Sequence, residues 1–454
     1  MRQGSLVVGK VILMGVASLL VFWPALHGGW IGDEVWYLPD RQWRLWSSDT
    51  LGYHLASVAL HFLSALLVWR LLDKLGLKLA WLGGMIFAVH PVQVESVACI
   101  VELKSTLSLP PLLLAMMAWV DFEENRSKRD YLLALGWFLV ATLCQITLAP
   151  FPVLILLYGW WKRGRVGWAE VKVSVPFFFI ALTFGMYAIW VEEMYALPDP
   201  IPLGGVFSRI VCAGTTLGFY FTHCFSPAPQ LPVYPQWVVD PPNAVLLWPW
   251  VVMVGVGYLC WRQRRSWGRH ALFGLGFFVL FLVPFLGFMP LSYMSFTWVR
   301  DPVLYLPIIG LIGLVVAFLE WGEGKVSAGR RMPLLGIVVL GIAVLGWRSH
   351  DYAARFMSPE KLWTYTIGHN PDAWPAYQNL GNELLRRGDA TRALAFFAEV
   401  VRRQPGYAEG HDDLGIALED LHQMPEAIAQ FEQALKLNPD DAKAREQLIK
   451  LHAQ

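Results

Sequence analysis

Long apolar runs recur along this chain and constrain its fold more than any other feature. A membrane-spanning helix needs about 20 consecutive apolar residues. The chain is 56% hydrophobic and only 16% charged, whereas soluble proteins are roughly 45–50% apolar. Eleven runs fit one span each: 7–26, 53–72, 79–98, 105–121, 131–146, 147–161, 172–191, 244–261, 270–289, 302–320 and 332–349. The sequence therefore predicts an all-α, polytopic helical bundle in a membrane.

Lysine and arginine are concentrated in every second loop between these runs. The basic clusters lie at residues 74–78, 126–129, 162–165, 262–269 and 325–331. Because positively charged loops tend to remain in the cytoplasm, this alternation predicts a cytoplasmic N-terminus and a C-terminal tail outside the cytoplasm. We expect the first run to be an uncleaved signal anchor.

Two segments need separate treatment in this topology. Counting the apolar segment 205–226 as a twelfth span would place the basic loop at 262–269 outside, so we predict a re-entrant or interfacial helix there. The segment 131–161 is short for two passes, yet basic clusters flank both of its ends. It is therefore expected to form a tight hairpin that turns at 147–152.

The tail repeats with a period of 34 residues. The matching pairs are Leu380/Leu414, Gly381/Gly415, Leu384/Leu418, Ala393/Ala427, Phe397/Phe431 and Pro405/Pro439. This pattern resembles the tetratricopeptide repeat, in which a pair of helices forms each unit. We predict a membrane module at 1–350 and a tetratricopeptide-repeat domain at 357–454. The latter is expected to contain a half repeat at 357–371, full repeats at 374–407 and 408–441, and a capping helix at 442–454.

Two polar segments lie at the ends of apolar runs on the same predicted outer face. Asp33 and Glu34 follow the first run, and His90 and Glu95 lie at the outer end of the third. Ionisable groups at such places are costly unless they pair, bind a cation or face water, so they are candidates for function. The acid pair could supply a base and a metal ligand, or it could be an ordinary loop pair. His90 could equally be a structural, helix-capping histidine.

Further candidate residues lie on this face. Glu102 and Lys104 follow Glu95, Arg300 and Asp301 precede the tenth run, and Tyr305 lies at its start. A guanidinium suits an anionic phosphate through paired hydrogen bonds, although Arg300 and Asp301 could instead form a local ion pair. Arg209, on the predicted interfacial helix, is a second candidate for phosphate binding, with snorkelling as the alternative.

Several function classes find no support. The sequence contains no glycine-rich phosphate loop, nucleotide-fold signature or serine nucleophile elbow. The five cysteines match neither a disulfide framework nor a zinc site. Basic residues are spread over the predicted cytoplasmic loops, which gives no indication of nucleic-acid binding. His54 and His61, at helical spacing within one run, are expected to make interhelical hydrogen bonds.

Several motifs together resemble one family. They are the acid pair after the first run, HPVQVES followed by ELKSTLS, LLYGWWKRGR at 156–165, PVYPQWVVDP at 232–241, DPVLYLPIIGL at 301–311, and the repeats. The chain is similar to the transmembrane and tetratricopeptide-repeat O-mannosyltransferases and their bacterial relatives, of the GT-C glycosyltransferase superfamily. Two motifs differ: the family's Ser-Lys-Thr is Gln145-Ile146-Thr147 here, and its Asp-Arg-Tyr is Asp301-Pro302-Val303.

The resemblance implies transfer of mannose or another hexose, with inversion, from a polyprenyl-phosphate donor to a Ser or Thr hydroxyl of an extracytoplasmic protein. It also implies a bacterial inner-membrane location with the repeats in the periplasm. Asp33 or Glu34 would be the general base. Glu95, with His90, would orient the acceptor or a divalent cation, Mg or Mn, which Asp33, Glu34 and Glu95 could bind.

The remaining candidates would contact the substrates. Lys104, Arg209 or Arg300 would stabilise the departing phosphate, and Glu102, Asp301 and Tyr305 complete the expected substrate-binding set. The repeats would bind an acceptor polypeptide or another protein partner. A non-catalytic membrane scaffold that presents the repeats is the alternative. A transporter would require charges in mid-span and inverted halves, and neither is evident.

Overall fold

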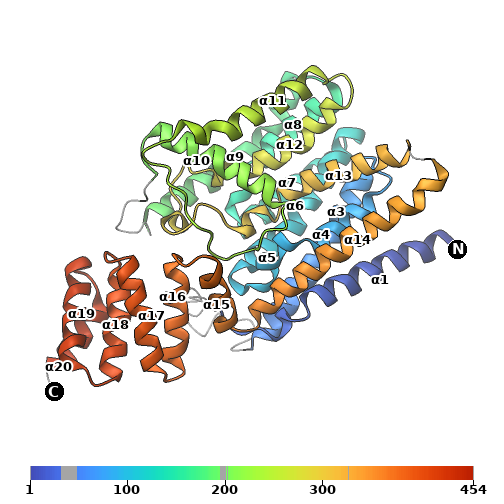
Figure 1. Cartoon of the computed structure of the whole chain (residues 1–454). Coiled ribbons are helices and arrows are strands. Elements are labelled where there is room, and N and C mark those ends of the chain that lie inside the picture. Colours follow the sequence, from blue (N-terminus) through green and yellow to red (C-terminus); the bar gives the residue numbers. More distant parts are fainter. Residues whose placement is uncertain (1, 32–48, 195–200, 202, 326, 453–454) are drawn as a thin grey trace. The chain divides into compact units, whose positions relative to one another are not determined.

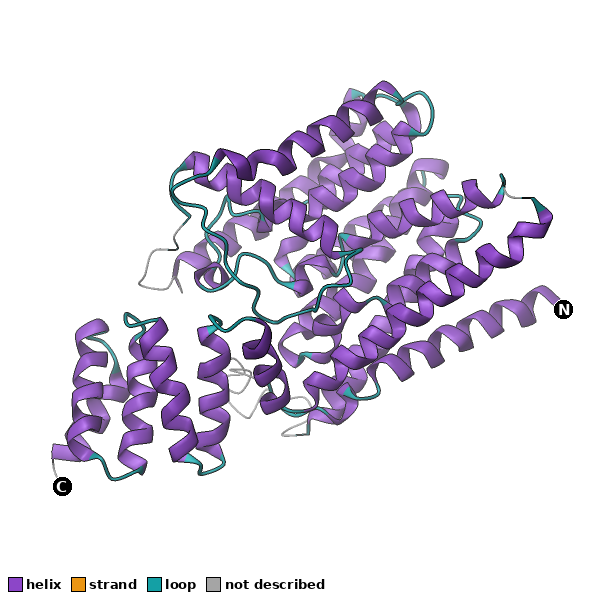
Figure 2. Cartoon of the chain, in the orientation of Figure 1, coloured by secondary structure: helices purple, strands orange, loops and turns teal. Residues whose placement is uncertain are grey.

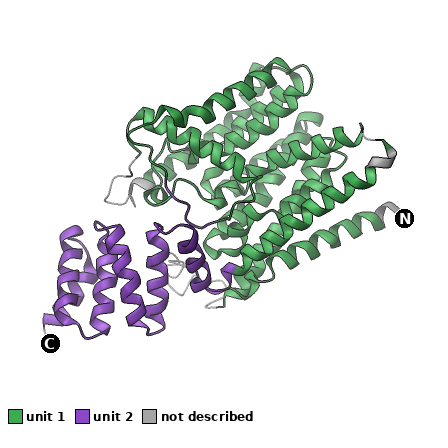
Figure 3. Ribbon diagram, viewed as in Figure 1, with its two compact units in different colours: residues 1–28, 44–230, 237–354 green, residues 29–43, 231–236, 355–454 purple. Residues whose placement is uncertain are grey.

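A computed structural model describes residues 2–31, 49–194, 201, 203–325 and 327–452. Within these ranges every regular element is a helix, as Figures 1 and 2 show. The all-α prediction is therefore confirmed for the described part of the chain. The chain forms two compact units, coloured in Figure 3. The first comprises residues 1–28, 44–230 and 237–354, and the second 29–43, 231–236 and 355–454.

The first unit is a bundle of apolar helices. These are α1 (Arg2–Phe22), α3 (Thr50–Lys74), α4 (Ala80–Val89), α5 (Val94–Ala98), α6 (Leu103–Asn125), α7 (Lys128–Cys144), α8 (Phe151–Arg163), α9 (Trp168–Met194), α10 (Val206–His223), α11 (Trp248–Arg262), α12 (Gly268–Leu282), α13 (Ile308–Glu323) and α14 (Ala328–Ala353). Seven segments among the described residues are long and apolar enough to cross a membrane: Ser5–Phe22, Thr50–Lys74, Ile100–Asn125, Trp168–Val191, Ala244–Arg262, Gly268–Phe285 and Arg331–Met357.

The other four expected spans form shorter helices. α7, α8 and α13 have 17, 13 and 16 residues, and α4 has ten. The expected span at 79–98 is not continuous, because proline disfavours helical backbone at the residue before it. His90 is extended, with φ −77° and ψ 133°, and a 3-10 turn, η3 (Pro91–Gln93), follows. The polar segment after α4 therefore turns back into the bundle and is buried throughout from His90 to Ala98.

Helices α3 and α4 approach each other closely at Gly84. A Cβ atom on Gly84 would lie 2.7 Å from the carbonyl oxygen of Ala65 and 2.8 Å from the Cβ of Trp69. Only glycine allows this backbone separation. The contact holds α4 inside the bundle, where it also packs against α1, α13 and α14.

The segment predicted to be interfacial forms α10. Its buried positions include Ser208, Cys212, Thr216, Tyr220 and His223, which lie three or four residues apart and therefore share one face of the helix. This face packs into the first unit and ends at His223. The placement of α10 relative to a bilayer stays a prediction.

The second unit contains a series of paired helices. They are α15 (Pro359–His369), α16 (Trp374–Arg386), α17 (Ala390–Arg403), α18 (Ala408–Asp420), α19 (Met424–Leu437) and α20 (Ala442–His452). The same contact joins both complete pairs: a Cβ on Gly381 would lie 2.6 Å from the Phe397 ring, and one on Gly415 would lie 2.8 Å from the Phe431 ring. The 34-residue period therefore reflects one helix–helix contact made twice.

Gly381→Ala is expected to destabilise the tail by about 1–3 kcal/mol, because the added methyl group overlaps the buried Phe397 ring. Gly368→Ala is the matched control, since Gly368 is exposed on α15 with no atom within 4 Å of an added Cβ. This control should be neutral or stabilising by up to about 1 kcal/mol. Hydrogen exchange of the tail helices in the full chain measures both effects, and equal protection in the two variants would contradict the contact.

Candidate functional site

Charged side chains from three separate stretches of the first unit meet at one cluster. Glu95 lies on α5, Glu102 ends the 3-10 turn η4 (Ile100–Glu102), and Lys104 lies in the first turn of α6. Arg300 precedes the 3-10 turn η9 (Asp301–Leu304). The two carboxylates are about 200 residues from Arg300 in sequence, so the cluster is a product of the tertiary fold.

Arg300 is shared between the two carboxylates. Its Nη2 lies 3.5 Å from Oε1 of Glu95 and 3.3 Å from Oε1 of Glu102. Glu102 also accepts a 2.9 Å hydrogen bond from Ser105 Oγ, and its Oε1 lies 3.9 Å from Nζ of Lys104. Glu102 thus lies between two cations and is held by a hydroxyl group.

Exposure separates the carboxylates from the cations of the cluster. The Glu95 and Glu102 side chains are 5% and 4% exposed, whereas those of Arg300 and Lys104 are 30% and 52% exposed. Burial raises the pKa of Glu95 well above its usual range, and the nearby Arg300 only partly opposes this shift. Burial alone would lower the pKa of Arg300, but Glu102 and Glu95 raise it instead. The cluster therefore combines two partly exposed cations with two buried acids. Of these acids, Glu95 is the one whose raised pKa favours the protonated form.

Asp301 is bound from α10 by a residue that was not among the predicted site residues. His223 Nε2 lies 3.0 Å from Oδ1 of the fully buried Asp301. On the same helix, Tyr220 Oη accepts a 3.0 Å hydrogen bond from the backbone N–H of Arg300. Helix α10 therefore positions both Arg300 and Asp301. In the sequence, the feature that could have indicated this role of α10 is the stripe of small and polar residues that ends at His223.

Other buried polar groups beside Glu95 were also missed. Neither the amide oxygen nor the amide nitrogen of Gln93 has a hydrogen-bond partner among the described residues, and the same holds for Ser96 Oγ and Glu95 Oε2. Gln93 and Ser96 are fully buried. Buried polar groups are normally paired, so these atoms indicate space for water or a bound polar group. In the sequence, the only feature of the motif HPVQVES that could have indicated Gln93 and Ser96 is their polarity.

The backbone uses both ring nitrogens of His90. Nε2 donates a 3.1 Å hydrogen bond to the Cys224 carbonyl oxygen, and Nδ1 accepts one of 3.4 Å from the Val92 N–H. Burial lowers the pKa of His90 to about 4. The structure therefore places His90 as a cap of the turn after α4, and its role toward a substrate stays a prediction.

Two further candidate residues lie apart from the cluster. The Tyr305 hydroxyl group is buried and bonds His61 Nδ1 at 3.0 Å, while His61 Nε2 bonds the Ala88 carbonyl oxygen at 3.1 Å. His61 thus makes the expected interhelical contacts. Arg209 Nη1 donates to the Phe288 carbonyl oxygen at 2.9 Å. Arg209 precedes His223 by 14 residues on α10, which is about 21 Å along a helix.

A small cavity of about 30 Å³ lies beside the cluster. Ser105, Ser108, Gln145, Thr147 and Tyr305 are among the residues that line it. Ser108 Oγ donates a 2.8 Å hydrogen bond to Gln145 Oε1. The motif Gln145-Ile146-Thr147 therefore contacts α6 at Ser108, three residues after the Ser105 that donates to Glu102, although it lacks a lysine.

The described residues do not by themselves fit a divalent metal. Among them, no group of three or more His, Cys, Asp or Glu side chains is arranged to hold an ion, whereas magnesium requires near-octahedral oxygen ligands. Glu95 and Glu102 already share Arg300. The predicted base residues Asp33 and Glu34 lie outside the described residues.

Seven potential membrane-spanning helices, a charged cluster at helix ends and a series of paired helices define an integral membrane protein with a helical-repeat tail. Two models described as tetratricopeptide repeat match the tail, at residues 348–408 and 408–441. The period of 34 is thereby assigned to this repeat class.

Known relatives extend the similarity to the membrane part. The chain is 22% identical, over 86% of its length, to the protein O-mannosyl-transferases Tmtc3 of Drosophila melanogaster and TMTC3 of Mus musculus and Homo sapiens. The matches confirm the resemblance to the family of transmembrane O-mannosyltransferases with tetratricopeptide repeats. The aligned part covers 50% of the fly protein and 46% of each mammalian protein, so the chain spans about half the length of these relatives.

Arg300→Gln is expected to destabilise the first unit by about 2–4 kcal/mol, because it leaves two buried carboxylates without their shared cation. Glu95→Gln should destabilise the first unit less, since the amide is neutral and Glu102 still pairs with Arg300. Thermal unfolding of the detergent-solubilised chain compares the two. An unchanged melting temperature in Arg300→Gln would exclude this role.

Proposed function

We propose that this chain is an integral-membrane GT-C glycosyltransferase. It moves mannose or another hexose from a polyprenyl-phosphate donor to a Ser or Thr hydroxyl of an extracytoplasmic protein, with inversion. The relatives named as protein O-mannosyl-transferases support the reaction class. The single structural observation that supports it best is the pair of accessible cations, Arg300 and Lys104, above a buried acid pair at helix ends.

The charge balance of this cluster suits a phosphate leaving group. With Glu95 protonated, Glu102 is the one charged carboxylate among the four side chains of the cluster and faces two cations. The neighbouring Asp301 is paired with His223. Both cations are partly exposed. Cations placed where charge develops stabilise a transition state strongly when water is excluded. The contact between His223 and Asp301 holds the segment that carries Arg300 in place.

In the reaction, Asp33 or Glu34 removes the proton from the acceptor hydroxyl group. The hydroxyl oxygen bonds to the anomeric carbon from the face opposite the phosphate, which inverts the configuration. The bond between the anomeric carbon and the phosphate oxygen breaks, and its electron pair leaves with the polyprenyl phosphate. Arg300 and Lys104 stabilise that charge. Gln93 and Ser96 offer unpaired polar atoms for sugar or acceptor hydroxyl groups.

The proposed topology retains eleven spans, with α4, α7, α8 and α13 as short spans shielded by their neighbours. The N-terminus is cytoplasmic, and the site and the repeats are extracytoplasmic, as expected for a bacterial inner membrane with a periplasmic tail. The module bounds remain 1–350 and 357–454, and the repeats bind the acceptor polypeptide.

Membranes containing the chain, incubated with radiolabelled polyprenyl-phosphate mannose, should label protein. Arg300→Gln should reduce the rate at least 100-fold, since one oxyanion-stabilising donor contributes roughly this much. Arg264→Gln is the control, because Arg264 is exposed on a basic loop over Trp261. Full activity in both Asp33→Asn and Glu34→Gln would remove the base assignment. No transfer from any polyprenyl-phosphate hexose would favour the scaffold alternative.

Donor binding should weaken as the pH rises. Below the raised pKa of Glu95 the carboxyl group is neutral and Arg300 keeps its net charge for the phosphate; above it, the carboxylate neutralises Arg300. The KM for the donor should therefore rise with pH through a midpoint above the ordinary glutamate value of about 4.3. Glu95→Gln should keep a low KM with no such midpoint, and a wild-type KM independent of pH would contradict this role.

A further inference from the structure

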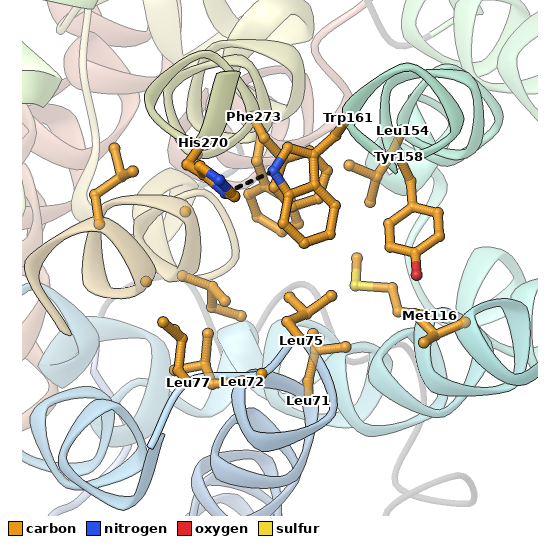
Figure 4. A pocket seen from close by; sticks show the side chains of 18 of the residues that line it. Leu71, Leu72, Leu75, Leu77, Met116, Leu154, Tyr158, Trp161, His270 and Phe273 are labelled. Carbon is orange, nitrogen blue, oxygen red and sulfur yellow. Dashed lines mark hydrogen bonds between the residues drawn. The ribbon is translucent and has the colours of Figure 1, made fainter. Parts of the chain in front are cut away.

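An apolar cavity of about 260 Å³ lies between helices of the first unit, away from the charged cluster. It is lined from α3, α6, α8, α12 and α13 and the turn after α3. Figure 4 shows Leu71, Leu75, Met116 and Phe273 pointing into it. Its volume is comparable to that of a small ligand site.

The cavity lies along the second half of α6, away from Glu102, and along the first ten residues of α13. Met116 follows Glu102 by 14 residues, which corresponds to about 21 Å along a helix. Trp161 is in the last turn of α8, and His270 is in the first turn of α12. These ends adjoin the basic loops, so positive charge predicts that the cavity opens toward the cytoplasmic leaflet.

The wall of the cavity is almost entirely hydrocarbon. One side carries a polar pair, in which Trp161 Nε1 donates a 3.1 Å hydrogen bond to His270 Nδ1, drawn as a dashed line in Figure 4. The Trp161 ring also stacks on Phe273, with centroids 4.7 Å apart. The indole N–H is already paired, whereas the buried Tyr158 hydroxyl group has no hydrogen-bond partner among the described residues. The remaining lining side chains offer an apolar chain a mostly hydrocarbon surface.

Two exposed lysines adjoin residues that line this end of the cavity. The exposed Lys162 holds its Nζ 5.1 Å from the Trp161 ring centroid and 5.7 Å from that of Tyr158, and both rings line the cavity. The exposed Lys78 directly follows the lining residue Leu77. By contrast, the neighbouring Lys74 is committed to an ion pair with Asp121.

We propose that this cavity binds an anionic phospholipid of the cytoplasmic leaflet. One acyl chain occupies the space between α3, α8 and α13, and the phosphate lies at Lys162 and Lys78. An anionic headgroup is favoured because juxtamembrane basic residues attract acidic lipids by about 1 kcal/mol each. The site is independent of the proposed transfer reaction and holds for a scaffold as well.

The test uses the full chain purified from vesicles of equal phosphatidylglycerol and phosphatidylcholine, with retained lipid identified by native mass spectrometry. Wild type should retain phosphatidylglycerol at least fivefold over phosphatidylcholine. Ala317→Phe, which fills the cavity from α13, should reduce this retention about tenfold. Ala343→Phe is the matched control, since Ala343 is exposed on α14.

A second pair of variants tests the headgroup without altering the packed interior. Lys162→Gln should lower the preference for phosphatidylglycerol two- to fivefold, whereas Arg264→Gln, another exposed cation stacked on a tryptophan, should not. Equal retention in Ala317→Phe and Ala343→Phe would overturn the proposal. So would retention without headgroup preference, or displacement of phosphatidylglycerol by polyprenyl phosphate. Sugar transfer, assayed on the same variants, separates loss of this lipid from failure of the proposed reaction.

Discussion

The burial of charge in an apolar helical body is the constraint on which this structure depends. Two glutamates with almost no exposure can be accommodated because Arg300 lies within 3.5 Å of both. That pairing requires the chain to leave helical geometry after α4 and again before α13, where 3-10 turns bring the side chains inward. Removing a charge from water is expensive, so these irregular segments are held by many hydrogen bonds, including those from α10.

The sequence was sufficient for the helical class and the repeats. Long apolar runs and the 34-residue period carry that information locally. The continuous span at 79–98 was not correct, because Pro91 ends α4 early and the following turns are set by tertiary contacts. Length alone could not reveal that α4 is only ten residues long.

The site was predictable only where neighbouring residues belonged to one recognisable motif. Glu95, Glu102 and Lys104 follow one another, so their grouping was accessible from the sequence. The pairing of Asp301 with His223 was not, since nothing local links an aspartate to a histidine 78 residues earlier. Arg209 and Tyr305 have suitable chemistry, but the fold directs Arg209 to a backbone carbonyl and Tyr305 to a buried histidine. Residue type identifies candidates, and the tertiary fold selects among them.

The contact made by Gly381 with Phe397 is repeated by Gly415 with Phe431. In such a stack each unit touches only the units before and after it. Evolution can therefore add whole units by duplication, or delete them, without redesigning the rest of the protein. The length of the tail becomes a quantity that selection can adjust while the membrane helices keep their own sequence constraints.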